Sequence, residues 1–347
     1  MFCESLFFRI GGIYFTMKVL RLIALSALTF AIPFTVFYGG GKIADNGVPV
    51  SPAEYKGILT LWHIDTFEGG VGSRKQFLLS VSRDFEKRNA GVLVMAMDRT
   101  AESAKAAIAE GKFPDLISFG AGVDVGNLRP LDLSVKSYGG GYNGVTYAVP
   151  WARGGYCLIE NPDFTANKKD ALPIIVSQGE NTNPLVAYAL SGRTGTDFEI
   201  LTPVNAYLKF TSGKAKYLVG TQRDINRLIA RGTDFVSVPL AGYNDLYQYI
   251  AVATNDETKA PYCAEFINFM ISESVQKKLH TIGMYGCYYR AEYDSPDMSA
   301  MQETENGYCI SAFSSAKLIK DLQEKGKAAA AGNENELAKI KKLIVSP

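Results

Sequence analysis

The sequence predicts an α/β protein built from two lobes, and three observations support this prediction. The chain has 347 residues, which is longer than a typical single domain of about 100 to 200 residues. Short apolar segments alternate along it with segments whose apolar residues recur at helical spacing, a pattern typical of parallel sheets covered by helices. Hydrophobic residues make up 47% and charged residues 20% of the chain, the composition of a globular protein rather than a disordered one.

The first predicted elements follow one another as strand and helix. An apolar run at 57–63 (GILTLWH) precedes the turn-like DTFEGGVGS, and Ser73 then opens a helix whose apolar residues keep helical spacing as far as Phe85. We then expect a strand at 92–97, a helix at 101–112 and a third strand at 115–120. Ligands of open α/β sheets bind outside the carboxyl ends of the strands. This rule places on one rim Trp62, His63, Asp65, Glu68, Gly69, Gly70 and the loop after Phe119.

A second block begins with a segment that is expected to cross between the lobes. It lies at 147–161 (YAVPWARGGYCLIEN), where Pro150 and Trp151 interrupt an apolar run, and a second crossing strand is predicted at 239–254. The other expected elements are a strand at 215–219 and helices at 203–212, 221–231, 259–283, about 314–325 and about 334–344.

The first 41 residues are predicted to be an export signal or a signal anchor. Lys18 and Arg21 precede an uncharged apolar run at 22–38, and a basic flank followed by such a run is typical of these segments. If it is not cleaved, the run is long enough to cross a bilayer, which takes about 17 to 25 residues. The chain from residue 42 onward would then lie outside the cytoplasm, or be secreted or periplasmic after cleavage.

Other interpretations of this segment stay open. A buried helix of the folded domain is the alternative, but Pro33 and the three glycines at 39–41 suit a processed segment better. Met17 is an alternative start to Met1. No Cys comes directly after the apolar run, so we expect no lipid anchor there.

Charge and cysteine spacing exclude two classes of partner. The formal net charge is +1, whereas nucleic-acid-binding proteins carry a basic patch or stripe, so we predict no nucleic-acid partner. No C-x-x-C occurs, and we predict no metal site. The cysteines beyond the apolar run are Cys157, Cys263, Cys287 and Cys309; three disulfide pairings are open to them, and buried free thiols are an equal alternative.

Three glycine-rich stretches resemble phosphate-binding motifs by letter. Gly139–Gly144 matches G-x-G-x-x-G, but no predicted strand precedes it and no helix follows, so a turn is the better interpretation. The loop at 119–122 follows a strand, yet Pro130 comes before any long helix. The stretch at 69–75 lacks the Gly-Lys-Ser/Thr of a phosphate loop. Its backbone N–H groups, at the start of a helix, are expected to receive a polar ligand instead.

Catalysis has little support in the sequence. The chain has two histidines, of which His280 falls inside a predicted helix and His63 forms a lone His-x-Asp with Asp65. Neither G-x-S-x-G nor H-E-x-x-H occurs. We therefore predict no catalytic residue and no cofactor.

Aromatic and basic residues near the predicted rims and crossings favour solute binding. The aromatic residues are Trp62, Trp151, Tyr243, Tyr247 and Tyr249. Flat rings can stack on the face of a sugar while polar side chains bond its hydroxyls, although packing in the core is an equal alternative for each ring. Arg153 and Arg223 can hold a carboxylate or paired hydroxyls. The alternative for Arg223 is an ion pair with Asp224 or Asp245.

The junction between the strand and the helix near residue 221 has a simpler explanation. Thr221 and Asp224 fit a capping box, in which each side chain bonds the other residue's free N–H. Gln222 and Arg223 are left as the pair that is expected to face a ligand.

Several motifs, taken in order, resemble one family. They are GILTLWH with EGGVGS, FEKRNAGV, AEGKFPDLISFG, YAVPWARGGYCLI, FTSGKAKYLVGTQRDINRL and FINFMISESVQKKLHTIGM, which together span about 57–290. This sequence resembles the family 1 extracellular solute-binding proteins of bacterial ABC importers. The resemblance implies a hinged, two-lobe fold of the periplasmic-binding-protein type (type II), with the ligand in a cleft between the lobes. It also implies discontinuous lobes, one from 57–148 with 246–283 and the other from 149–245 with 284–347.

The resemblance also implies a function. It predicts a receptor that closes on a polar solute and hands it to the permease subunits of an importer. A sugar or oligosaccharide is the expected solute, and a peptide or another polar solute is the alternative. A module that senses solute for a membrane signalling partner is the first alternative, and an exported hydrolase is the second. The predicted ligand-binding residues are Trp62, Asp65, Glu68, Gly70, Ser73, Gly120, Trp151, Arg153, Gln222, Arg223, Tyr243 and Asp245. The stretch at 161–203 is short for a second lobe of this family, which predicts a reduced cleft on that side.

Overall fold

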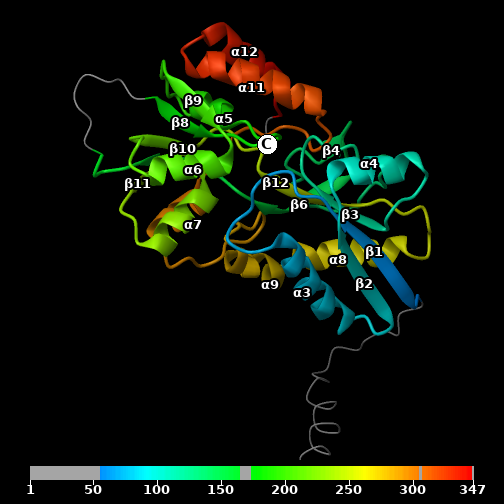
Figure 1. Cartoon of the computed structure of the whole chain (residues 1–347). Coiled ribbons are helices and arrows are strands. Elements are labelled where there is room, and N and C mark those ends of the chain that lie inside the picture. Colours follow the sequence, from blue (N-terminus) through cyan, green and yellow to red (C-terminus); the bar gives the residue numbers. More distant parts are fainter. Residues whose placement is uncertain (1–54, 165–172, 305–306, 346–347) are drawn as a thin grey trace, which may run out of the picture. The chain divides into compact units, whose positions relative to one another are not determined.

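The computed structural model describes residues 55–164, 173–304 and 307–345, and the predicted export signal at 1–41 lies outside these ranges (Figure 1). Among the helices within them, none combines the length and the apolar character that a membrane crossing needs.

The first of two five-stranded sheets has the strand order β2–β1–β3–β12–β6. β1 (Gly57–His63) lies parallel to β2 (Val92–Asp98) and to β3 (Leu116–Phe119), which confirms the predicted parallel pairing. β12 (Tyr247–Val252) runs antiparallel between β3 and β6 (Ala148–Arg153). The carboxyl ends of β1, β2 and β3 therefore meet at one edge, as predicted.

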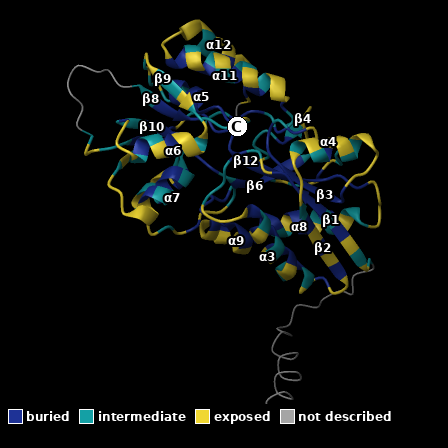
Figure 2. Cartoon of the chain, viewed as in Figure 1, coloured by how far each residue is buried: buried dark blue, intermediate teal, exposed yellow. Residues whose placement is uncertain are grey.

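Helices cover both faces of this sheet (Figure 1). α3 (Arg74–Glu86) and α8 (Ala260–Met270) pack on one face, and α4 (Ala101–Ala109) packs on the other. Neighbouring residues of a strand point to opposite faces, so Leu61 joins the core under α3 and Trp62 joins the core under α4. β3 and β12 are buried throughout, whereas the edge strand β2 alternates buried and exposed residues, and Figure 2 shows that the helices keep an exposed side.

The second sheet has the order β11–β7–β10–β8–β9. β8 (Ile174–Ser177), β9 (Phe198–Leu201) and β10 (Tyr217–Thr221) are parallel. β7 (Tyr156–Glu160) is antiparallel to β10, and the edge strand β11 (Val236–Pro239) is antiparallel to β7. No helix or strand was expected between 161 and 203, yet β8, α5 and β9 lie there and build one side of this sheet.

Six helices surround the second sheet. One face is covered by α5 (Pro184–Leu190), α11 (Ala316–Ala330) and α12 (Glu334–Leu343), and the other by α6 (Pro203–Thr211), α7 (Gln222–Arg231) and α10 (Pro296–Glu303). α11 approaches α5 closely at Gly326, where an added Cβ would lie 3.1 Å from the backbone nitrogen of Val186.

The chain passes between the two sheets through adjacent segments. Gly154 and Gly155 join β6 to β7, and the Gly154 N–H donates to the Leu246 carbonyl at 2.7 Å, where the chain returns towards β12. Arg153 and Tyr285 exchange two backbone hydrogen bonds of 2.9 Å each. These segments lie where the sequence predicts crossings; the predicted limits of the lobes stay a prediction.

The predicted helix at 259–283 is wrong as a single element. It divides into α8, a short α9 (Glu273–Gln276) and a 3₁₀ helix (Lys277–Ile282). Ser272 adopts an extended backbone, and its hydroxyl donates to the Phe269 carbonyl at 2.7 Å, which ends α8. His280 lies in the 3₁₀ helix and is exposed.

The glycine-rich stretch at 139–144 is a turn, as predicted. The two-residue strands β4 (Gly141–Tyr142) and β5 (Val145–Thr146) form a hairpin. Asn143 and Gly144 both have positive φ, 50° and 79°, which a two-residue type I′ turn requires and which explains the Asn-Gly pair.

The four cysteines of the described ranges are free thiols. Burial raises the pKa of Cys263, Cys287 and Cys309 to about 12 and raises that of Cys157 strongly. All four are therefore protonated at neutral pH and behave as small apolar groups.

Candidate functional site

The loop after β1 is held by an ion-pair and hydrogen-bond network around Asp65. Its carboxylate lies 2.9 Å from His63 Nε2 and 2.7 Å from Arg74 Nη2. Burial raises the pKa of Asp65, but the His63 hydrogen bond and the Arg74 charge outweigh it, so the pKa is lowered overall. Buried Arg74 also donates to Gln248 at 3.2 Å and to the Phe67 carbonyl. The network fixes the path of this loop.

His63 also takes part in a chain of Ser, His and Asp side chains. Its Nδ1 lies 3.1 Å from the hydroxyl oxygen of Ser118, on the opposite side of the ring from Asp65. These are the residue types of a hydrolase triad. Ser118, however, is fully buried, and its oxygen accepts hydrogen bonds from Trp151 Nε1 and Gln248 Nε2 at 3.0 and 3.1 Å. No substrate carbonyl can reach it in this conformation, so the chain of bonds holds the sheet together.

The same loop also contacts the second sheet's side of the molecule. Glu68 forms an ion pair with Arg223 at the first turn of α7. This pairing corrects the alternative from the sequence, in which Arg223 pairs with Asp224 or Asp245. An added Cβ at Gly70 would collide with the Ile282 carbonyl and with Gly283, so Gly70 permits close approach of two backbones.

Ser73 and Gly120 have roles within the first sheet's side of the molecule. Ser73 is the N-cap of α3, and its hydroxyl accepts from the Gln76 N–H at 3.3 Å. An added Cβ at Gly120 would collide with the Thr66 hydroxyl. Both positions support the loop that follows β1.

The two tryptophans are buried. Trp151 is fully buried, stacks on Phe77 with ring centroids 5.8 Å apart and donates to Ser118. Trp62 is 4% exposed, and the Arg99 guanidinium lies 4.8 Å from the centre of its ring. In this conformation neither ring offers a face to a solute.

Tyr243 and Asp245 belong to a buried polar network in the second crossing segment. The Asp245 carboxylate accepts from Tyr156 at 2.6 Å, from Asn183 at 2.7 Å and from Tyr243 at 3.1 Å. Burial raises the pKa of Asp245, and these hydrogen bonds only partly oppose the rise. Gln222 is likewise buried, and its Oε1 accepts from the Gly155 N–H at 3.0 Å.

The predicted capping box at the start of α7 is confirmed. The Thr221 N–H donates to Asp224 Oδ2 at 2.9 Å, and the Thr221 hydroxyl accepts from the Arg223 N–H at 3.3 Å. Asp224 is buried, and burial raises its pKa to about 6.

A small cavity of about 20 Å³ lies beside this cap. Its walls include Phe67 and Glu68 from the loop after β1 and Ser177, Thr221 and Asp224 from the second sheet. The space is enough for about one water molecule. The loop after β1 therefore leaves no room for a larger ligand at this junction.

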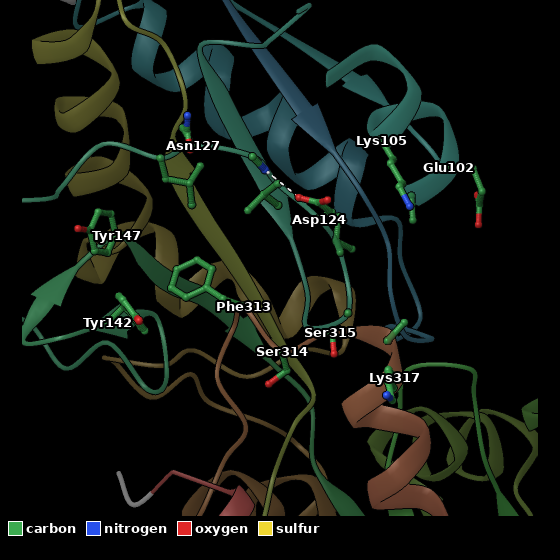
Figure 3. Close-up of a pocket in the computed structure, with 17 residues that line it drawn as sticks. Glu102, Lys105, Asp124, Asn127, Tyr142, Tyr147, Phe313, Ser314, Ser315 and Lys317 are labelled. Atoms are coloured by element: carbon green, nitrogen blue, oxygen red, sulfur yellow. Dashed lines mark hydrogen bonds between the residues drawn. The ribbon is translucent and has the colours of Figure 1, made fainter. Parts of the chain in front are cut away.

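A much larger cavity, of about 1020 Å³, lies along α4 (Figure 3). Its walls are the first half of α4, the loop after β3 at 122–128, the β4–β5 hairpin and the segment 313–317 that enters α11. The volume is at the upper end of the range of about 300 to 1,000 Å³ for small-molecule sites.

Aromatic rings form one wall of this cavity. Tyr142 and Tyr147, on the hairpin, lie near Phe313 in Figure 3, and the Tyr147 and Phe313 rings meet edge to face with centroids 6.4 Å apart. Tyr142 is 63% exposed, so its ring is free to stack on a ligand.

Charged and amide side chains line the other walls of the cavity along α4. Glu102, Lys105, Asp124 and Lys317 all line the cavity, and within the described ranges none of them forms an ion pair. Asp124 accepts one hydrogen bond, from the Gly126 N–H at 3.3 Å. Much of the hydrogen-bonding capacity of these groups is therefore available to a polar ligand.

Close backbone contact holds two walls of the cavity together. The Gly122 N–H donates to the Ser314 carbonyl at 3.0 Å. Gly122 has φ 91°, and an added Cβ would lie 2.8 Å from both Asn181 and Ile319. Only glycine suits such a position, so it ties the loop after β3 to the start of α11.

None of the twelve predicted binding residues lines this larger cavity. Glu68 lines the small one, and Arg153 lines a third, described below. The rule that ligands bind at the carboxyl ends of strands did place the loop after Phe119 on the rim. The local sequence does not mark Tyr142, Tyr147 or Phe313 as ligand-binding residues, because only the fold brings them to that loop.

Solved structures of bacterial binding proteins have the same fold. The GacH receptor of Streptomyces glaucescens, solved unliganded and with acarbose, matches with a TM-score of 0.55 at 15% identity, over 84% of this chain and 99% of that one. The sugar-binding protein MalE from Xanthomonas citri matches with a TM-score of 0.57 at 13% identity, over 83% and 95%. Iron-bound HitA from Pseudomonas aeruginosa matches with a TM-score of 0.52 at 14% identity, over 78% and 99%.

These likenesses confirm the predicted two-lobe, periplasmic-binding-protein-like fold. Because sugar-binding and iron-bound proteins share it, the fold alone does not choose a ligand. No protein-family model matches the sequence, and no curated protein matches it either. Membership of family 1 therefore stays a prediction.

Proposed function

We propose that this protein is an extracytoplasmic receptor that binds a polar solute, a sugar or oligosaccharide, and delivers it to an ABC-type importer. The solute binds in the cavity along α4 and leaves chemically unchanged. The N-terminal segment exports the protein or anchors it in the membrane.

One observation supports this proposal above all: a cavity of about 1020 Å³ combines aromatic rings with charged groups that have no ion-pair partner among the described residues. Sugars present flat apolar C–H faces and a rim of hydroxyl groups. Aromatic rings stack on such faces, and carboxylates, amides and ammonium groups bond the hydroxyls. Tyr142 with Phe313 supplies the first kind of contact, and Glu102, Asp124 and Asn127 supply the second.

Delivery to an importer rests on the two-lobe fold. In the GacH and MalE structures this fold belongs to a receptor and to a sugar-binding protein. Glycine-rich crossing segments such as Gly154–Gly155 are suited to hinge motion. A transporter can then recognise the closed, loaded form.

The test is a thermal-shift screen of mono- and oligosaccharides on the full chain in an uncharged detergent. A ligand at a hundred times its dissociation constant adds about 2.7 kcal/mol to the free energy of unfolding. Recovery of the unchanged sugar by chromatography separates binding from hydrolysis. If no sugar raises the melting temperature, the carbohydrate proposal fails.

Two further results would separate import from sensing. Stimulation of ATP hydrolysis by a reconstituted importer, dependent on the loaded receptor, supports delivery. Binding without any such stimulation, together with a ligand-dependent complex with a membrane signalling protein, supports the sensing alternative instead.

A further inference from the structure

A third cavity, of about 540 Å³, lies where the crossing segments meet. Its described walls come from separate parts of the chain: Lys136 and Tyr138 before β4, Arg153 at the end of β6, Gly242, Tyr247 at the start of β12, the segment 286–290, the end of α10 at 302–304, and Gly307. The solute proposed above does not use it.

Positive charge dominates the walls that the described residues form. Among the described lining residues, Lys136, Arg153 and Arg290 are basic and Glu303 is acidic. Glu303 lies 3.9 Å from Arg290, and both side chains are about two-thirds exposed, so water and salt screen this pair. Neither Lys136 nor Arg153 forms an ion pair with any residue of the described ranges.

Arg153 is fixed in place by contacts with uncharged groups. Its Nη2 donates to the Gln302 carbonyl at 2.6 Å, and its guanidinium carbon lies 5.2 Å from the centre of the Tyr285 ring. The backbone N–H and carbonyl of Arg153 both form hydrogen bonds with the backbone of Tyr285. The remaining guanidinium N–H groups have no partner among the described hydrogen bonds, and a guanidinium can bind a carboxylate or phosphate through two of its N–H groups.

The aromatic floor beside Arg153 is also held rigidly. Tyr138 stacks on Tyr247 with centroids 5.6 Å apart and planes 26° from parallel. Its backbone has φ 43°, a conformation that non-glycine residues rarely adopt. The Tyr249 hydroxyl holds that backbone by donating to the Tyr138 carbonyl at 2.6 Å. Lys136 Nζ lies 5.0 Å from the centre of the Tyr138 ring, so a second cation sits over the same floor.

We propose that this cavity is a second binding site, which takes a small organic anion bearing a carboxylate or a phosphate group. Arg153 binds the anionic group, Lys136 contributes a second positive charge, and the Tyr138 ring contacts the organic part. Arg290 lies at the more exposed side, where Glu303 competes with the ligand for it.

The test is a calorimetric titration of the full chain, in an uncharged detergent, with inorganic phosphate and separately with citrate. Sodium chloride at equal ionic strength provides the reference. We expect at least one of the two anions to bind saturably with one site per chain, and the two titrations distinguish phosphate from carboxylate recognition. If neither anion binds beyond the chloride reference, the proposal is overturned.

Variants locate the anion. Arg153→Gln is expected to weaken binding by at least about tenfold, or 1.4 kcal/mol, and Lys136→Gln is expected to weaken it less. Arg129→Gln is the matched control, because Arg129 bonds Glu257 through both nitrogens in a different part of the structure; it is expected to bind as the unmodified chain does. An equal loss in Arg129→Gln would mean that only net charge matters, which overturns the proposal.

Two further measurements keep the result decisive. If Arg153→Gln does not fold, Lys136→Gln and Arg290→Gln decide, since both remove exposed or partly exposed charges; unchanged affinity in both overturns the site. Tyr142→Ala, in the cavity along α4, is expected to leave anion binding unchanged. Failure of the sugar screen therefore does not affect this proposal, and failure of the anion titration does not affect the proposed function.

Discussion

The junction around Glu68 and Arg223 and the cavity along α4 both lie beyond the carboxyl ends of strands, yet they differ in what their polar groups do. At the junction, the side chains of Asp65, Glu68 and Asp224 bond other parts of the protein, and about 20 Å³ of space remains. In the cavity along α4, charged groups that form no ion pair with a described residue surround about 1020 Å³. Polar residues at strand ends thus become structural when a neighbouring loop reaches them, and remain available for a ligand where the surrounding segments leave a cavity open.

The largest effect is expected at Trp151 and tests whether this side chain packs in the core rather than in a binding site. A role in stacking on a solute, which the sequence leaves open for Trp151 beside core packing, would make Trp151→Ala lower affinity without unfolding the protein. Because Trp151 is fully buried and stacked on Phe77, we expect instead a loss of about 3–5 kcal/mol in the free energy of unfolding. Urea unfolding measures it.

Tyr142→Ala is the control for Trp151→Ala, because it removes an exposed ring and should change stability by no more than about 0.5 kcal/mol. If the Trp151→Ala protein folds with normal stability but binds the solute weakly, Trp151 contacts the solute and this prediction is wrong.

The second prediction concerns the buried carboxylate at the junction. Asp224 has a pKa of about 6 in the folded chain against 3.8 for an ordinary carboxyl group, so folding takes up a proton between these values. The contribution of Asp224 to the free energy of unfolding is therefore lowest above pH 6. It rises by about 3 kcal/mol as the pH falls towards 4, at 1.36 kcal/mol per pH unit.

Asp224→Asn keeps a cap acceptor for the Thr221 N–H and removes the titration. We expect the variant to be more stable than the unmodified chain at pH 7 and to lose this advantage by pH 4, as measured by urea unfolding across that range. Asp132→Asn, at an exposed position, is the control and should show no such trend. A pH-independent difference for Asp224→Asn would contradict the assignment.

The third prediction concerns the cavity along α4. For any sugar found in the screen, Tyr142→Ala and Phe313→Ala are each expected to lower affinity by about 1 kcal/mol, roughly fivefold, because each removes a stacking ring. Calorimetry measures the change. Tyr289→Ala, which removes an exposed ring outside this cavity, should bind the sugar normally; equal losses in all three would place the sugar elsewhere.

The smallest effect is expected at the ion pair across the junction. Glu68 and Arg223 are partly exposed, at 36% and 22%, so a double-mutant cycle of Glu68→Gln and Arg223→Gln should give a coupling of about 0.5 to 1 kcal/mol that weakens with added salt. The surface pair Arg129 and Glu257 provides the comparison. Zero coupling would show that the two groups do not hold the junction.

Local signals explain how much of this protein could be predicted. The capping box of Thr221 and Asp224 spans four residues, and the strand at 57–63 and the helix after Ser73 each show their apolar pattern within about a dozen residues or fewer. Each of these is confirmed because the hydrogen bonds or the burial pattern that define it act over short stretches of chain. The helix predicted at 259–283 divides because Ser272 and Gln276 bond groups that the helical period does not reveal, including the Trp151 carbonyl at 2.8 Å.

The alternation of strands and helices, the crossings and the class of fold follow from the sequence alone, since periodicity and capping are properties of neighbouring residues. Which polar groups are left for a ligand depends on how distant segments pack. Trp151, Gln222 and Asp245 are polar or aromatic residues near a rim, yet packing from distant segments buries them. Tyr142 and Phe313 are 171 positions apart in the chain, and they line one cavity because the Gly122–Ser314 contact brings those segments together.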